Sequence, residues 1–261
     1  MRSVAAIRET IESSLAARIP AALSPRLHQS TELLRTGIAE VDALLEGGLP
    51  LGSLTEITGP TCSGRSTLVS SILAGATRQG AACAYVDVAD AFDPLSAAAI
   101  GIQLGRLLWV RAGRAEKSDK QVWASLDRAL RATDLLLNAG GFRVIVLDMG
   151  DVRAEQVRRV PLASWYRYRL QAEKSQAVFL LLAQTPCANS CASVVLHCTE
   201  AAERWDYATG NQNGLPLLTG LQYSVSADRK RASAREFATP FSKKPVSAAQ
   251  TAWKRTTLWA R

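Results

Sequence analysis

The strongest constraint on the fold is one eight-residue stretch, GPTCSGRS from Gly59 to Ser66, between an apolar run and a helical pattern. The spacing of its two glycines lets backbone N–H groups surround phosphate oxygens, and the N-terminus of a following helix adds partial positive charge. Arg65 stands where this motif ordinarily has lysine. The stretch therefore predicts a phosphate-binding loop in an α/β fold, with a glycine-rich turn that binds no ligand as the alternative.

The region after this loop continues to alternate short apolar runs with helical patterns. This alternation predicts a mostly parallel central sheet flanked by helices. The last runs follow one another without helices of useful length, which predicts antiparallel edge strands. The expected strands are 54–58, 84–88, 107–111, 144–147, 178–183, 193–197, 221–227 and 235–238, and the expected helices are 66–79, 94–104, 121–138 and 162–174.

The N-terminal segment predicts an amphipathic helix that ends at Pro20. Its apolar residues recur at spacings of three or four and form one stripe, which docks either on another molecule or on the protein's own core. The stripe comprises Val4, Ile7, Ile11 and Leu15, followed by Ile19. We therefore divide the chain into an N-terminal helix and linker (1–35), a core (36–228) and a C-terminal tail (229–261).

The tail carries the net charge of the chain. Nine basic residues and one acidic residue lie in 229–261, so that segment accounts for the whole formal charge of +8. Such a segment favours a nucleic acid or another acidic partner, and a solvating tail is the alternative. Tryptophans among the charges support the partner interpretation. The candidate residues are Arg229, Lys230, Arg231, Lys243, Lys244, Trp253, Lys254, Arg255 and Trp259.

A second basic segment lies inside the core, where residues 153–174 hold six basic and two acidic side chains with aromatic residues between them. This composition is typical of a groove for single-stranded nucleic acid and also of a protein–protein interface. A surface helix whose rings pack inward is the alternative. The candidate binding residues are Arg158, Arg159, Trp165, Arg167 and Arg169.

The five cysteines and the absence of long apolar runs indicate a cytoplasmic protein with reduced thiols, no secretory signal and no membrane span. The nearest approach to a metal pattern is formed by Cys187, Cys191, His197 and Cys198. It contains no C-x-x-C pair, so we expect ordinary buried thiols and no metal site.

Four segments in order carry a resemblance to the RecA superfamily. They are TGIAEVDALLEGGLPLGSLTEITGPTCSGRSTL (36–68), CAYVDVADAFDP (83–94), RVIVLD (143–148) and VFLLLAQ (178–184). The short chain, substituted loop and basic C-terminus most resemble the ImuA group. The resemblance implies a RecA-like P-loop core with an altered nucleotide site. The implied nucleotide-binding residues are Gly59, Gly64, Arg65, Ser66, Thr67, Asp148 and Gln184.

The same resemblance implies a role in SOS-induced mutagenesis, during translesion DNA synthesis. The implied partners are RecA on single-stranded DNA, a catalytically inactive Y-family (ImuB-like) polymerase homologue and an error-prone replicative-type polymerase. Because RecA proteins pack an N-terminal helix on a neighbouring subunit, the N-terminal stripe is expected to dock on RecA or on a second copy.

Three departures from the RecA pattern fall on the chemistry. Arg65 replaces the lysine, Ala89 stands where a glutamate activates water, and Ser96 replaces a tyrosine that stacks on adenine. We therefore expect no catalytic residue and no required cofactor, with weak binding of ATP and Mg²⁺ at most. The departures favour a non-catalytic module over an active DNA-dependent ATPase. A SulA-like regulator of cell division is the second alternative.

Overall fold

A computed structural model describes residues 32–113, 119–207 and 216–230, which belong to one compact unit. The expected N-terminal helix and the strand expected at 235–238 lie outside the described residues. So do the predicted binding residues of both termini, namely Val4, Ile7, Ile11, Leu15, Arg231, Lys243, Lys244, Trp253, Lys254, Arg255 and Trp259.

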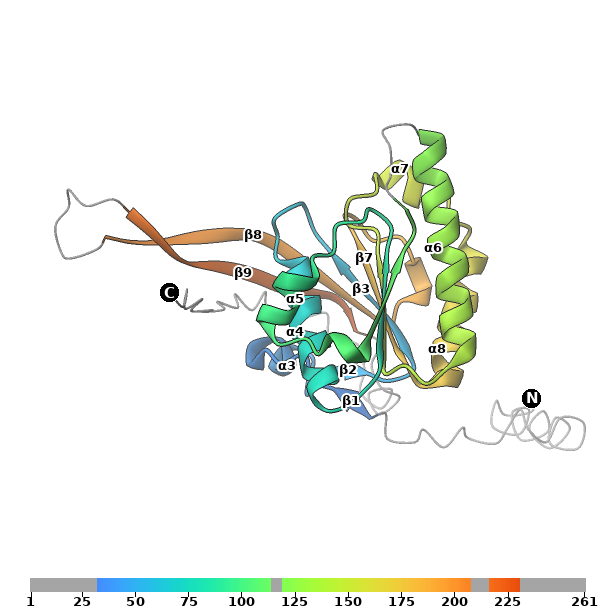
Figure 1. Cartoon of the computed structure of the whole chain (residues 1–261), viewed down its shortest axis with the longest axis horizontal. Helices are drawn as coiled ribbons and strands as arrows, with labels where there is room; N and C mark the ends of the chain where they lie inside the picture. Colours follow the sequence, from blue (N-terminus) through green and yellow to red (C-terminus); the bar gives the residue numbers. More distant parts are fainter. Residues whose placement is uncertain (1–31, 114–118, 208–215, 231–261) are drawn as a thin grey trace, which may run out of the picture. The chain divides into compact units, whose positions relative to one another are not determined.

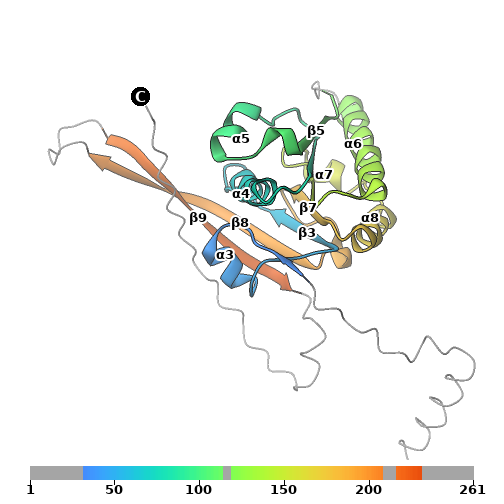
Figure 2. The ribbon, with the colours of Figure 1, turned by 60° about the horizontal axis from the view of Figure 1, so that its bottom comes forward.

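The core is built on a seven-stranded sheet with the order β5-β4-β6-β7-β3-β8-β9. All neighbouring strands pair in parallel except β8 and β9, which are antiparallel (Figures 1 and 2). The predicted α/β class and mostly parallel sheet are thereby confirmed. The strands are β3 (Ser53–Thr58), β4 (Cys83–Asp87), β5 (Leu107–Arg111), β6 (Val144–Asp148), β7 (Val178–Ala183), β8 (Val194–Tyr207) and β9 (Pro216–Lys230).

Helices cover both faces of this sheet, with α4 and α5 on one side and α6 and α8 on the other (Figure 2). A small antiparallel pair, β1 (Leu33–Leu34) with β2 (Leu49–Pro50), precedes β3. The helices are α3 (Ala39–Leu44), α4 (Arg65–Arg78), α5 (Pro94–Ile100), α6 (Asp119–Ala139), α7 (Ala154–Val157) and α8 (Leu162–Ser175), with 3₁₀ turns at Leu104–Arg106 and Asn189–Cys191.

Alternation along the buried strands creates two hydrophobic cores. In β6, Ile145 packs in the core under α6 and α8, and Val146 packs in the core under α4. Both residues are fully buried. Successive side chains of a strand point to opposite faces, so an uninterrupted apolar run is what a strand covered on both sides requires.

The largest difference from the sequence-based expectation lies in β8 and β9. The predicted antiparallel edge is confirmed, since the run at 193–197 pairs antiparallel with β9, but from Val194 to His197 the same strand also pairs in parallel with β3. Beyond His197, β8 pairs with β9 among the described residues. Three register shifts interrupt this ribbon. They disturb the two-residue alternation by which strands are recognised, so both strands were predicted too short.

The end of one helix and the end of one strand also differ from their predicted positions. Helix α5 ends at Gly101, whose left-handed conformation (φ 98°) closes the helix before the expected end. Strand β9 includes Arg229 and Lys230, so the sheet continues past residue 228, where the tail was expected to begin.

Buried cysteines occur on both faces of the sheet. Cys191 and Cys198 lie in the two different hydrophobic cores, with the sheet between them. Within the described ranges, no cluster of three or more histidine, cysteine or acidic side chains could hold a metal ion. None of the described helices combines the length and apolar character needed to cross a membrane.

Candidate nucleotide-binding site

The phosphate loop follows β3 and leads into α4, as its sequence predicts. Gly64 has a left-handed conformation (φ 86°) directly before the helix. A Cβ atom at Gly64 would lie 2.6 Å from the Tyr223 ring, and one at Gly59 would lie 2.2 Å from the carbonyl oxygen of Cys198. Strands β8 and β9 therefore pack directly against the loop, and both glycines are required by this close approach.

The Arg65 side chain crosses from the phosphate loop to the end of β6. It is 7% exposed, and its Nη1 and Nη2 donate to the Gly150 carbonyl oxygen at 3.5 and 3.4 Å. Gln184 Nε2 donates to the same oxygen at 3.2 Å. One carbonyl thus joins the phosphate loop to the ends of β6 and β7. A guanidinium has five N–H donors, so these long bonds leave Arg65 with capacity for an oxyanion.

Asp148 lies at the end of β6 with both carboxylate oxygens engaged. Its Oδ2 accepts from the Tyr85 hydroxyl at 2.5 Å, and its Oδ1 accepts from the Gly150 N–H at 2.8 Å. Burial raises the pKa of Asp148 above its ordinary value. Burial, followed by the charge of Asp148, raises the pKa of Tyr85. Groups of the protein therefore already bind both oxygens of this carboxylate, and burial disfavours its ionised form.

The end of β4 provides two carboxylates, and each has a structural partner. Asp87 accepts from the backbone N–H groups of Ala91 and Phe92 at 3.2 and 2.9 Å. Asp90 receives Nε and Nη2 of Arg111, both at 2.6 Å. Ala89, between them, has no ionisable group. The structure thus assigns Asp87 to the turn and Asp90 to an ion pair, as expected for a carboxylate that does not replace the glutamate.

Ser96, at the position where the RecA pattern places a tyrosine, lies in the first turn of helix α5. Asp93 caps this helix by accepting from the backbone N–H groups of Leu95 and Ser96 at 3.2 and 3.0 Å. The hydrogen bond from the Ser96 hydroxyl, followed by these backbone contacts, lowers the pKa of Asp93. The Asp93 carboxylate is therefore engaged in helix capping, and Leu95 is exposed beside it.

Trp165 corrects one sequence-based prediction. Its side chain is 1% exposed, and its ring packs edge-on against Tyr168 at 6.0 Å, so it cannot stack on a base. Residues 165, 168 and 172 recur at helical spacing and face the sheet. The prediction relied on the composition of the segment, which does not show this spacing. Arg167 is ion-paired with Asp134 at 2.8 Å.

The other predicted residues of this segment lie on the surface. Arg158 and Arg159 are exposed between α7 and α8, and Arg169 is half-buried on α8. Tyr166 is the exposed ring of the helix. Exposed arginines and one exposed aromatic side chain, Tyr166, thus occur in this segment, while Trp165 is buried.

Two residues of the site were missed in the sequence. Tyr223 lies far from the loop along the chain, and no local pattern connects it with Gly64. Ser63 is buried, and its Oγ has no hydrogen-bond partner in the part of the chain that the structure describes. The loop therefore holds a buried hydroxyl that an oxyanion could satisfy.

Comparison with known proteins agrees with this geometry. The sequence profile of the RecA N-terminal domain matches residues 4–156, more than half of the chain. The chain belongs to the RecA family. The predicted RecA-like superfamily is thereby confirmed, and the finer assignment to the ImuA group stays a prediction.

Two curated relatives are named Protein RecA. The one from Ectopseudomonas oleovorans is 38% identical over 118 residues, which are 45% of this chain and 31% of the relative. The one from Rickettsia massiliae (strain Mtu5) is 32% identical over 148 residues, 56% of this chain and 40% of the relative. The matched region thus spans less than half the length of either relative.

Proposed function

We propose that this RecA-family chain is a binding and assembly module with little or no ATP turnover, acting in SOS-induced translesion DNA synthesis. It would link RecA on single-stranded DNA to an error-prone polymerase complex that contains an inactive Y-family homologue. The observation that carries the first part is Ala89, because no carboxylate at the end of β4 is left to activate water. A positioned general base contributes roughly 10²–10⁴-fold to a rate.

The remaining groups suit a phosphate better than a magnesium-dependent reaction. Arg65 and Ser63 offer donors, and the N-terminus of α4 adds partial positive charge. Asp148, the carboxylate on the magnesium side, is buried and already accepts two hydrogen bonds. Mg²⁺ prefers ionised oxygen ligands, so we expect weak nucleotide binding and no efficient hydrolysis.

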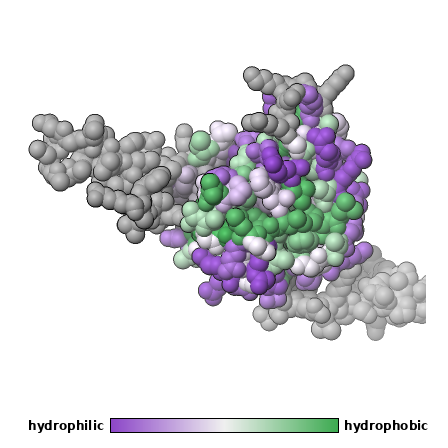
Figure 3. Space-filling view, viewed as in Figure 1, coloured by the Kyte–Doolittle hydropathy of each residue, from purple (hydrophilic) through white to green (hydrophobic). Residues whose placement is uncertain are grey.

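An apolar sheet edge supports the proposed association with RecA or with a second copy. Strand β5 pairs with β4 on one side, and no other described strand pairs with it. Leu104 and Leu108 are exposed along this edge. An apolar band crosses the molecule there, between α5 and α6 (Figure 3). An open apolar edge is a surface on which another chain can pair.

The test is recovery of partners from DNA-damaged cells with the tagged full chain. We expect RecA and polymerase subunits to be recovered, and fewer of them with a chain that ends at Lys230. This end point preserves β9, which a cut after residue 228 would shorten. Recovery of a tubulin-like division protein instead would contradict the proposal and favour the SulA-like alternative.

The same shortened chain tests the role of the basic tail in DNA binding. Each phosphate contact contributes about 0.9 to the slope of log affinity against log salt concentration. The shortened chain should bind single-stranded DNA more weakly and with a shallower slope. An unchanged slope would assign the tail to solubility.

A further inference from the structure

Helix α8 has an outward face that carries large apolar side chains. Leu162 and Tyr166 are 50% and 52% exposed, and Leu170 is exposed one turn further along. Their spacing of four residues places them in a row on one side of the helix. The opposite side holds Trp165 and packs on the sheet. Both sides of α8 therefore resemble contact surfaces, and only one of them is covered within the described part of the chain.

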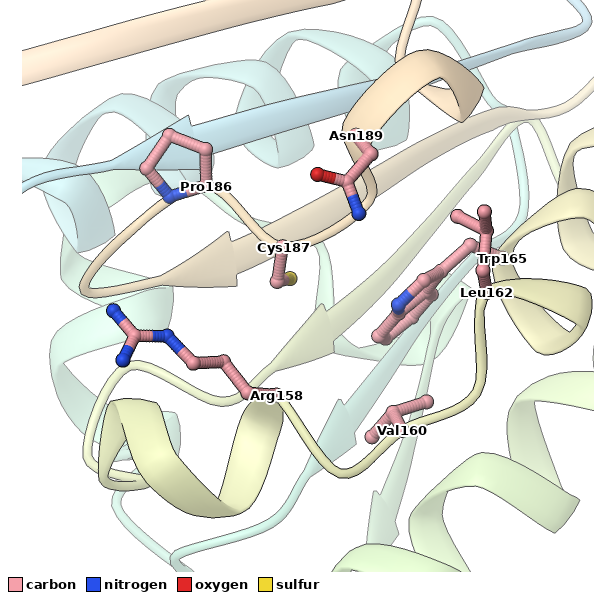
Figure 4. Close-up of a pocket in the computed structure, with 7 residues that line it drawn as sticks. All are labelled: Arg158, Val160, Leu162, Trp165, Pro186, Cys187 and Asn189. Atoms are coloured by element: carbon pink, nitrogen blue, oxygen red, sulfur yellow. The ribbon is translucent and has the colours of Figure 1, made fainter.

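A hollow of about 280 Å³ lies at the start of this row. It separates the segment before α8 from the loop after β7, with Arg158 and Trp165 on opposite sides of it (Figure 4). Most lining residues have apolar side chains, but the surface that they expose to the hollow is more polar than apolar, and Leu162 belongs both to the wall and to the exposed row. The lining residues are Arg158, Val160, Leu162, Trp165, Pro186, Cys187 and Asn189.

A buried carboxylate fixes the far wall of the hollow. Glu56 Oε1 accepts from the backbone N–H groups of Cys187 and Ala188, both at 2.7 Å. Burial, and then the charge of Glu56, raises the pKa of the Cys187 thiol well above its ordinary value, so the thiol stays neutral. The hollow therefore has an uncharged wall at Cys187, fixed by Glu56, and a cationic side chain at Arg158.

The charge around this surface is positive. Within 153–174, Arg153 and Arg167 have acidic partners, Asp119 and Asp134. Arg158, Arg159 and Arg169 form no ion pair with any described residue. Such arginines, beside exposed apolar side chains, favour a partner that carries acidic residues between apolar ones.

The side chains favour a peptide over a nucleic acid. Base stacking needs exposed aromatic faces, and the described surface offers Tyr166 between two leucines, because Trp165 is buried. The loop after β7, TPCANSCAS, contributes no basic residue to the other wall. The row of exposed apolar side chains on α8 is instead suited to contact with apolar side chains of a peptide.

We propose that the α8 face and its hollow are a docking site for an acidic, amphipathic peptide segment of a partner protein. Aromatic or large aliphatic side chains of the peptide lie along Leu162, Tyr166 and Leu170, and a neighbouring side chain of the peptide enters the hollow. Its carboxylates face Arg158 and Arg159. The proposal does not depend on the nucleotide site, so the two can fail separately.

The experiment selects binders from a displayed library of random peptides with the full chain as bait. Enriched sequences are then synthesised with a fluorescent label, and their affinities are measured by anisotropy. We expect net negative peptides with a shared aromatic or large aliphatic anchor. Tyr166→Asp should weaken their binding at least about tenfold, as loss of a central contact does. Arg158→Glu should weaken it and reduce its salt dependence.

The matched control is Leu135→Asp on α6, because Leu135 is also an exposed leucine, at 71%. It should leave peptide affinity unchanged, and all three variants should melt as the unmodified chain does. Neutral or basic peptides, no enriched peptide, or affinities insensitive to Tyr166→Asp would overturn the proposal. So would an oligothymidine that binds through Arg158 while no peptide does, which would assign the surface to nucleic acid.

Discussion

The end of the sheet beside the phosphate loop and the outer face of α8 use their side chains in opposite ways. At the loop, Asp148 is held by Tyr85 and Gly150, and Asp90 is held by Arg111. On α8, large apolar side chains are exposed beside arginines without ion pairs. The first region has internal partners for the groups that chemistry would use, and the second has groups that no other described residue covers.

This difference indicates where binding energy can be gained. A buried carboxylate that already accepts two hydrogen bonds gains little from a further ligand. An exposed apolar side chain gains about 25 cal/mol for each Å² that a partner covers. The difference therefore supports the proposal that this RecA-family core serves association more than nucleotide chemistry.

The two neighbouring aromatic residues of α8 offer the sharpest contrast in stability. Trp165→Ala should lower the free energy of unfolding by about 3–5 kcal/mol, since it empties a buried site. Tyr166→Ala should change it by less than about 0.5 kcal/mol, because half of that side chain is exposed. Denaturant unfolding measures both. Equal effects would remove the distinction between the inner and outer faces of α8.

Glu56 should be the next most sensitive position. Glu56→Ala leaves two backbone N–H groups without their acceptor, at Cys187 and Ala188, and should cost about 2–4 kcal/mol. Glu56→Gln keeps an amide oxygen for both donors and should cost less. Thermal melting of both variants tests this anchor of the hollow. A Glu56→Ala chain as stable as the unmodified one would contradict it.

Removing the charge of Asp148 should change the stability by a smaller amount than the substitutions at Trp165 and Glu56. This change should stabilise the protein, whereas those substitutions destabilise it. Because the pKa of Asp148 is raised in the folded protein, the folded state holds an extra proton between the ordinary value of 3.8 and that raised pKa. Stability should therefore rise as the pH falls through this window. Asp148→Asn should stabilise the protein at neutral pH and remove this rise. Unfolding measured across the window checks the sign, and destabilisation by asparagine at neutral pH would contradict it.

The smallest expected effect concerns Arg65. Arg65→Lys should tighten nucleotide binding, because an ammonium fits among phosphate oxygens, yet leave ATP turnover near background. Only the double variant with Ala89→Glu has a carboxylate for water activation at that position. Titration with a fluorescent ATP analogue and a turnover assay separate the two steps. Recovery of turnover by Arg65→Lys alone would show that the lysine was the only missing part.

Much of the fold could be predicted because buried parallel strands are continuous apolar runs between turn residues. The expected 107–111 and 178–183 match β5 and β7 at both ends. The resemblance to the RecA superfamily implied Asp148 and Gln184 as site residues, and the structure places them at the end of β6 and directly after β7. These signals are local, so a single sequence carries them.

The remainder depends on contacts that no local pattern encodes. The orientation of Trp165 depends on the phase of α8 relative to the sheet, which composition does not reveal. The contact of Tyr223 with Gly64 joins distant parts of the chain. The partners of Asp87 and Asp90 depend on how the turn after β4 folds.

The central claim is that this RecA-family core binds without turning over ATP. The direct measurement is ATP hydrolysis by the full unmodified chain, at saturating Mg²⁺-ATP, with and without single-stranded DNA. The matched control is the Arg65→Ala, Asp148→Ala double variant, which lacks the cation of the phosphate loop and the carboxylate at the end of β6. The account predicts equal rates for the two proteins under both conditions. DNA-stimulated hydrolysis by the unmodified chain, well above the rate of the control, would contradict it.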